Sequence, residues 1–217
     1  MDAAPDDQRP DDGPRARAGQ TKRTRTRAAL IAAADSAFSA RGWAATRVED
    51  IAAAAGVSAA TAYNHFPTKH VLIGVVFAPH IATLLVQADH DIARERPVLE
   101  ALDDQINALA RLSYYHRGLT AAFTAAVLEY TIRTGDTPDP EDDLDPRTIV
   151  PLLAPLTRLV RYGQRSGQLR RDPSPEDISS TVVNLMLVRS LNRRDEHADT
   201  TAALLRTLLF RTMAPPA

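Results

Sequence analysis

Apolar residues recur at helical spacing over most of the chain. From Thr24 onward they form one stripe at the i, i+4, i+7 and i+8 positions typical of an amphipathic helix. The stripe consists of Leu30, Ile31, Ala34, Ala37 and Phe38. Gly42 ends the predicted helix, since glycine readily adopts the left-handed backbone that closes many helices. No long alternation of β-branched residues occurs, and only 5% of the residues are aromatic, so the pattern predicts an all-helical protein.

A short second helix is predicted after this break. Thr46 and Glu49 have the S/T-x-x-E spacing of a capping box, in which the two side chains satisfy free backbone N–H groups at a helix start. The helix is therefore expected to begin at about Arg47. It reaches Gly56, a residue that can take a left-handed turn.

Further helices are marked by capping residues and prolines. Ser58 is the expected N-cap of a third helix over residues 59–66, which Pro67 stops. Thr68 is the expected cap of a fourth helix. The rest of the chain predicts five more helices, at about 97–114, 118–133, 147–166, 175–191 and 198–212.

Two features could suggest a metal, and neither has the required spacing. The segment 134–146 contains three prolines and six acidic residues but lacks the pattern of a helix–loop–helix calcium site, so a solvated, mobile loop is expected. His80, His90 and His116 are scattered and have no histidine four residues away, which argues against zinc. We predict no metal and no cofactor.

The formal net charge of -1 hides an uneven distribution of charge. Residues 1–12 sum to -4 and residues 13–27 sum to +6, the latter including Arg23 and Arg25. Because residues 1–20 have no apolar period, they are expected to be a disordered arm. A basic arm on a neutral-to-acidic body favours one local contact with an anionic polymer.

Composition disfavours several classes of function. The chain has no cysteine, which excludes a disulfide scaffold, thiol catalysis and cysteine-ligated metals. No apolar run approaches the roughly 18 residues of a membrane span, and the acidic start is not a secretory signal. A cytoplasmic protein without a membrane contact is expected. The patterns of a P-loop, a nucleophile elbow, a zinc protease and a dinucleotide site are missing, so an enzyme is not predicted.

Residues 47–66 have the pattern of a helix-turn-helix. Such a motif needs small residues where its helices cross and a glycine at the turn, and Ala52, Gly56 and Ala62 occupy these places. The second helix then presents short or polar side chains that can reach the floor of a DNA groove. These are Ser58, Ala59, Thr61, Asn64 and His65. Phosphate contacts are also expected at two helix starts, where backbone N–H groups favour anions. The residues there are Thr46, Thr68 and Lys69.

Residues 24–73 resemble the DNA-binding region of the TetR/AcrR family of transcriptional regulators. The run from Thr46 to Ser58 is similar to the second helix and turn of that family, and the run from Thr61 to Lys69 is similar to its third helix and the start of its fourth. The resemblance implies DNA contacts, mostly at phosphates, by a set of eight residues. They are Thr46, Ser58, Thr61, Tyr63, His65 and Lys69, joined by Arg47 and Asn64.

The resemblance also implies the organisation and the function of the chain. The expected fold is all-α, with a disordered arm (1–20), a three-helix DNA-binding domain (21–67) and a helical effector-binding and dimerisation domain (68–217). The leading interpretation is a homodimeric repressor that binds a pseudo-palindromic site in double-stranded DNA and is released by a small-molecule effector. The alternatives are a DNA-binding dimer without an effector and a helical small-molecule enzyme.

Two surfaces of the larger domain are predicted from its helices. The last two long helices carry apolar stripes that can pair with a second copy as a four-helix bundle. The stripes consist of Ile178, Val182, Leu185, Met186, Leu204, Leu205, Leu208 and Leu209. The helix at 118–133 is apolar nearly all round, which predicts a buried helix with an effector pocket beside it. The expected pocket residues are Phe77, His80, Tyr115, His116, Phe123, Val127, Glu129, Tyr130 and Tyr162.

Overall fold

The regular structure of the chain is helical throughout the part that is described. The computed structural model describes residues 14–135, 137–193 and 195–213. Its helices are α1 (Pro14–Ala45), α2 (Val48–Ala54), α3 (Ala59–His65), α4 (Lys69–Ala93), α5 (Val98–Tyr115), α6 (Arg117–Thr134), α7 (Pro146–Ile149), α8 (Ala154–Arg165), α9 (Pro175–Asn192) and α10 (Ala198–Met213). The predicted all-α fold is confirmed.

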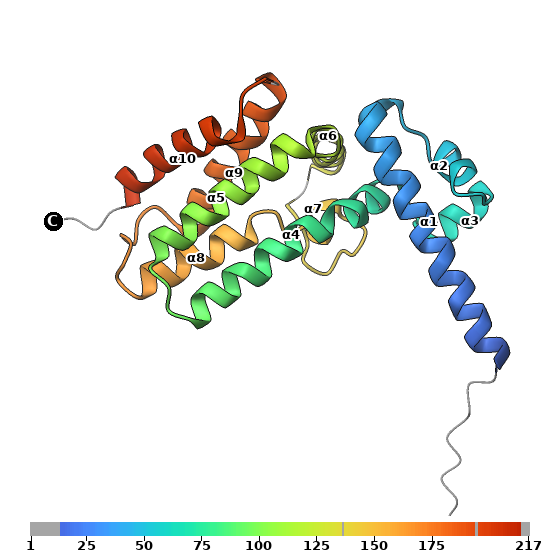
Figure 1. Ribbon diagram of the computed structural model, residues 1–217, viewed down its shortest axis with the longest axis horizontal. Coiled ribbons are helices and arrows are strands. Elements are labelled where there is room, and N and C mark those ends of the chain that lie inside the picture. The colour runs from blue at the N-terminus through green and yellow to red at the C-terminus, as the bar shows by residue number, and fades with distance from the viewer. Residues whose placement is uncertain (1–13, 136, 194, 214–217) are drawn as a thin grey trace, which may run out of the picture.

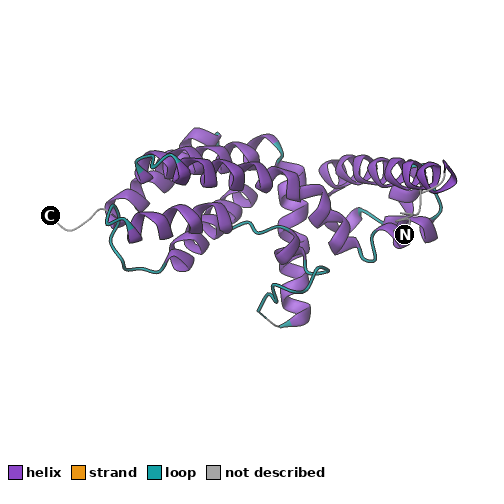
Figure 2. Ribbon diagram, turned by 90° about the horizontal axis from the view of Figure 1, so that it is seen from below, coloured by secondary structure: helices purple, strands orange, loops and turns teal. Residues whose placement is uncertain are grey.

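The helices form a small N-terminal unit and a larger body. α1, α2 and α3 lie together at one end, and α4 runs from this unit into the bundle of α5, α8, α9 and α10 (Figure 1). α6 is seen end-on in Figure 1 and stands across the long axis of the molecule in Figure 2. It packs against both α1 and α4, so it joins the two units.

The first helix begins earlier than its apolar stripe. α1 starts at Pro14, whereas the stripe predicted a helix from Thr24, and the disorder expected for residues 14–20 is wrong. Arginine, lysine, glutamine and alanine are good helix formers, and an extension of an anchored helix needs no apolar face of its own. Residues 1–13 lie outside the described part. The predicted break is present, because Gly42 has a non-helical backbone with φ 74°.

Two of the three predicted caps are confirmed. Ser58 accepts a hydrogen bond from the backbone N–H of Thr61, and Thr68 accepts one from that of Val71. The capping box at the start of α2 is wrong, because the N-cap is Arg47 and no side chain caps the helix.

The predicted helix at 147–166 is two helices. α7 ends at Ile149, and Val150 has an extended backbone because the following Pro151 disfavours the helical conformation of the residue before it. α8 then begins with Pro155 in its first turn, where proline is well tolerated.

α4 is the central helix of the body. It is long and apolar enough to meet the length and composition of a membrane span, contrary to the expectation from the sequence. Its apolar side chains pack against α1, α5, α6, α7 and α8. Leu72, Ile73 and Ile81 are fully buried in this packing, so these positions belong to the core of the fold. That core continues from Leu30 in α1 to Met213 in α10.

Candidate nucleic-acid interface

The helix-turn-helix forms as the small residues predicted. Gly56 adopts the left-handed backbone, with φ 70°, and the next amide, that of Val57, donates to the Ala52 carbonyl at 2.9 Å. Ala52 and Ala62 are each 1% exposed. The two short helices therefore cross through methyl-sized contacts, which leaves the other face of α3 free.

That free face carries the side chains expected to reach DNA. Ser58, Tyr63 and Asn64 are exposed, and Ala59, Thr61 and His65 are half-buried. Ser58 has a second task, because its hydroxyl lies 2.9 Å from that of Thr61 and accepts the Thr61 N–H at 3.1 Å. This pairing fixes the start of α3 and the direction of both hydroxyls.

A carboxylate that the sequence analysis missed orients Tyr63. The Tyr63 hydroxyl donates to Oε1 of Glu49 in α2 at 3.1 Å. This bond raises the pKa of Tyr63. The pKa of Glu49 is lowered, first by a hydrogen bond to its own backbone and then by Tyr63. The pair links residues 14 positions apart, and no short-range pattern in the sequence signals it.

The structure contradicts the expected phosphate contact by the Thr46 side chain. Thr46 is 1% exposed, and its hydroxyl lies 2.7 Å from the Gly42 carbonyl and 3.2 Å from that of Ala37. These carbonyls lie at the break in α1, where the helical bonding pattern is interrupted. The Thr46 hydroxyl therefore provides a hydrogen bond to the end of the preceding helix and does not point outward toward DNA.

Lys69 stands at the start of α4 and is turned toward the protein. Its ammonium donates to the Trp43 carbonyl and lies 3.9 Å from the centre of the Trp43 ring, within the range of a cation–π contact. Partial burial lowers the pKa of Lys69, and the charge of Glu129 opposes this effect. A phosphate contact would require the ammonium to leave this position.

The basic segment is a helix that projects from the N-terminal unit (Figure 1). Arg23 and Arg25 are exposed along it, as is Arg47 before α2. The guanidinium of Arg27 lies 4.7 Å from the centre of the Phe66 ring at the end of α3. This contact ties the basic helix to the helix-turn-helix.

A polar cluster joins the N-terminal unit to α6. Oε2 of Glu129 accepts a hydrogen bond from Trp43 Nε1 at 2.6 Å, and Oε1 lies 3.5 Å from Nε2 of His70. His70 is 6% exposed, and its ring centre lies 4.7 Å from that of Trp43 and 5.3 Å from that of Tyr130. Burial, and then the charge of Arg133, lower the pKa of His70. We call Trp43, Lys69, His70, Glu129 and Tyr130 the junction cluster.

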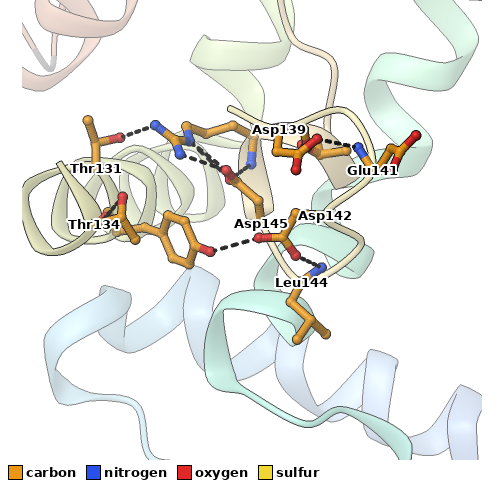
Figure 3. A network of polar contacts seen from close by, with 10 residues as sticks. Thr131, Thr134, Asp139, Glu141, Asp142, Leu144 and Asp145 are labelled. Carbon is orange, nitrogen blue, oxygen red and sulfur yellow. Dashed lines mark hydrogen bonds and ion pairs between the residues drawn. The ribbon is translucent and has the colours of Figure 1, made fainter. Parts of the chain in front are cut away.

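The acidic segment after α6 is anchored, whereas a mobile loop was expected. Asp145 is 2% exposed, and its carboxylate accepts three hydrogen bonds from the guanidinium and one from the backbone amide of Arg147. Asp142 accepts from the Tyr130 hydroxyl at 3.3 Å and from the Leu144 amide at 2.8 Å. Figure 3 shows how this network fastens the segment to the end of α6.

The residues predicted for one effector pocket lie in several places. Glu129 and Tyr130 belong to the junction cluster. Phe77 stacks on Phe123 in the core, with the two ring centres 4.5 Å apart. Tyr162 is half-buried on α8. The other predicted residues divide between two spaces: His80, Tyr115 and His116 line a groove between α4 and α5, whereas Phe123 and Val127 line a cavity beside α6. The prediction of a single pocket with these walls is therefore wrong.

The cavity beside α6 is mostly apolar. It has a volume of about 500 Å³ and is bounded by α6, α9 and the segment from α7 into α8. Val150, Leu153, Val183 and Leu187 are among its walls, and Arg147, Glu176 and Asn184 add polar groups. An apolar space of this size with few polar groups is typical of a small-molecule site.

Some residues of the apolar stripes predicted for the dimer pack inside the protomer itself. Ile178, Val182, Met186 and Leu205 are buried in the protomer, which corrects the expectation that all of them face a partner. Leu185, Leu204 and Leu209 are half-buried and Leu208 is 50% exposed. An apolar groove of about 180 Å³ runs between α9 and α10.

Comparisons with known proteins agree with this geometry. Residues 30–76 match the model of the bacterial regulatory proteins of the tetR family. The HTH-type transcriptional repressor Rv3405c of Mycobacterium tuberculosis is 38% identical over 91 residues, or 42% of this chain and 48% of that protein. The chain therefore matches about half the length of this relative. The HTH-type transcriptional repressor DhaR of a Mycobacterium species is 22% identical over 89% of this chain and 94% of its own length.

Solved structures match nearly the whole fold. FadR of Thermus thermophilus, a TetR-family transcriptional repressor solved with lauroyl-CoA, has a TM-score of 0.66 and 22% identity over 88% of this chain and 96% of its own. RolR, solved with resorcinol, has a TM-score of 0.60 and 18% identity over 91% of this chain and 92% of its own. The fold and the outward face of α3 define a helix-turn-helix protein. Residues 30–76 are similar to the helix-turn-helix region of the tetR family, and the whole chain has the fold of the TetR-family repressor FadR.

Proposed function

We propose that the chain is a transcriptional repressor that binds a pseudo-palindromic DNA site as a homodimer and releases it when a small molecule binds. The observation that carries the proposal is the free face of α3, framed by the start of α4 in a domain that matches the TetR family. Short polar side chains on an unobstructed helix suit the major groove, where the edges of the bases can be told apart.

The contacts divide into groove contacts and phosphate contacts. In this proposal Thr61, Asn64 and His65 approach the bases, with Ala59 leaving room for a close approach. Arg23, Arg25 and Arg47 would contact phosphates, and Lys69 would do so once its ammonium leaves the Trp43 carbonyl. Tyr63 is held by Glu49 with its hydroxyl at the edge of this face. In a dimer, two such helices would enter successive major grooves about 34–36 Å apart.

The effector is proposed to occupy the cavity beside α6. Its size and its apolar walls suit a small, largely apolar molecule. FadR and RolR, with similar folds, were solved with small molecules. Dimerisation is proposed at α9 and α10, where Leu185, Leu208 and Leu209 border an open apolar groove.

DNA selection with the purified full chain tests the DNA-binding part. We expect enrichment of one inverted repeat from a genomic library. Asn64→Ala should weaken binding to that repeat while leaving binding to unrelated DNA unchanged. Lys69→Ala should weaken binding to all DNA and lower its dependence on salt. Arg165→Ala is the matched control, since Arg165 is exposed at the end of α8, far from α3. Selection that enriches no motif would overturn the proposal.

A further inference from the structure

The groove between α4 and α5 has features that the proposed function leaves unused. It has a volume of about 480 Å³ and is separate from the cavity beside α6. α4 contributes His80, Thr83 and Leu84, and α5 contributes Arg111, Leu112 and Tyr115. His116, directly after α5, completes the polar side. We call this space the α4–α5 groove.

Four side chains of the groove carry polar groups with no partner in the described part of the chain. The imidazole rings of His80 and His116 lie with their centres 4.7 Å apart, and neither ring forms a hydrogen bond or an ion pair there. The exposed guanidinium of Arg111 has no carboxylate beside it. Tyr115 is 69% exposed, and its hydroxyl has no partner.

The charges around the groove favour an anion. No aspartate or glutamate is among its lining residues, and the acidic group that acts on His80 is Asp35 of α1. The pKa of His80 is lowered by burial and then by the nearness of His116. Two imidazoles at this distance resist taking up protons together. A negative charge between them would offset part of that repulsion and would also attract Arg111.

The same arrangement disfavours a metal cation. Within the described residues, no third histidine, aspartate or glutamate joins the pair in a group that could hold a metal ion. The permanent charge of Arg111 would also repel a cation. Leu84, Leu112 and Ala108 supply apolar surface beside the polar groups, which an inorganic anion would leave unused.

We propose that the α4–α5 groove binds a small organic anion, a carboxylate with an apolar body. The carboxylate lies between Arg111 and the two imidazoles, and the body of the molecule lies against Leu84 and Leu112. Tyr115 covers the open side. This binding requires neither DNA nor the cavity beside α6, so it stands or fails independently of the proposed repressor function.

Calorimetric titration of the full chain with benzoate and octanoate, and with benzamide and octanamide, tests the proposal. We expect a carboxylate to bind with one site per chain and its neutral amide to bind at least about tenfold more weakly. Arg111→Gln should weaken carboxylate binding by about tenfold or more, and His116→Asn should weaken it as well. Arg165→Gln, which removes an exposed charge elsewhere, should leave it unchanged. Thermal unfolding checks that each variant is folded.

Proton uptake provides a second readout. Because an anion favours a protonated imidazole, the ring signals of His80 in NMR spectra should titrate at higher pH with the carboxylate present. The charged groups of this region are Asp35 on α1, which acts on His80, and Arg111 on α5, which lines the same groove. Equal binding of acid and amide, no binding of either carboxylate, or no effect of Arg111→Gln would each overturn the proposal. Binding of zinc ions that His116→Asn abolishes would replace the anion with a metal.

Discussion

The contact between α1 and α6 offers a sharp test, because a glycine of α6 lies against the backbone of α1. Gly118 lies in the first turn of α6 against the backbone of Ser39 in α1. A Cβ atom added at Gly118 would lie 2.1 Å from the Ser39 carbonyl oxygen and 2.9 Å from its carbon. Ordinary contacts begin at about 3.4 Å, so Gly118→Ala requires the two helices to separate by about 1.3 Å. The obstructing atoms are backbone and cannot turn aside.

The expected cost follows from this displacement. Overpacking of this kind costs about 1–3 kcal/mol, whereas alanine in a helix is favoured over glycine by about 1 kcal/mol. A net loss of about 1 kcal/mol would lower the melting temperature by ~2–4 °C in a protein of this size. Since α1 belongs to the N-terminal unit, the shift should also change the placement of α3 and weaken binding to the proposed DNA site.

Gly19→Ala is the matched control. Gly19 is an exposed position in the same α1, and a Cβ there meets nothing within 4 Å. This variant should show the gain in helix stability alone and should melt slightly higher than the wild type. The measurements are urea unfolding and operator affinity. If Gly118→Ala stabilises the protein as much as Gly19→Ala does, the close approach of α1 and α6 does not exist in solution.

Three further predictions concern single contacts. Ser58→Ala should cost about 1 kcal/mol of unfolding free energy through loss of the α3 cap, and Ser58→Asn should retain most of it. Glu129→Ala leaves the indole N–H of Trp43 unpaired and should lower the free energy of unfolding by about 1–3 kcal/mol, whereas Glu129→Gln keeps an acceptor. The fluorescence of Trp43, the single tryptophan of the chain, follows the urea unfolding of both variants. Because the pKa of His70 is lowered in the fold, stability should fall as the pH drops through the unfolded value of about 6.5, and His70→Gln should reduce that slope in acid unfolding curves.

Local chemistry made the helix-turn-helix predictable. A cap such as Ser58 acts on an amide three residues away, and the positive φ of Gly56 depends on the turn itself. Both are visible within a few positions of the sequence. The same reasoning gave a wrong prediction for Thr46 as the cap of α2, because its hydroxyl bonds to the Gly42 carbonyl instead. A capping pattern does not show which of two helix ends the side chain will serve.

Contacts between segments far apart in the chain could not be predicted from one sequence. Glu129 was expected in a pocket because it lies on an apolar helix, and its actual partner is Trp43, 86 positions earlier. Phe77 and Phe123 were both expected to line the pocket, yet their rings stack on each other. Helical periodicity identifies an inward face without showing whether that face meets a neighbour or a cavity.

α6 gives the proposed effector response a physical route. Phe123 and Val127 are four residues apart on one side of the helix and line the cavity. Glu129 lies two residues further on, which turns it by about 200° to the opposite side, where it holds Trp43. The helix therefore stands between the cavity and the DNA-binding unit. A bound molecule that prefers a shifted position of α6 would move Glu129 away from Trp43. The contacts of Lys69 with Trp43 would then weaken. The bound molecule could change DNA affinity only by the difference in its own affinity for the two positions of α6.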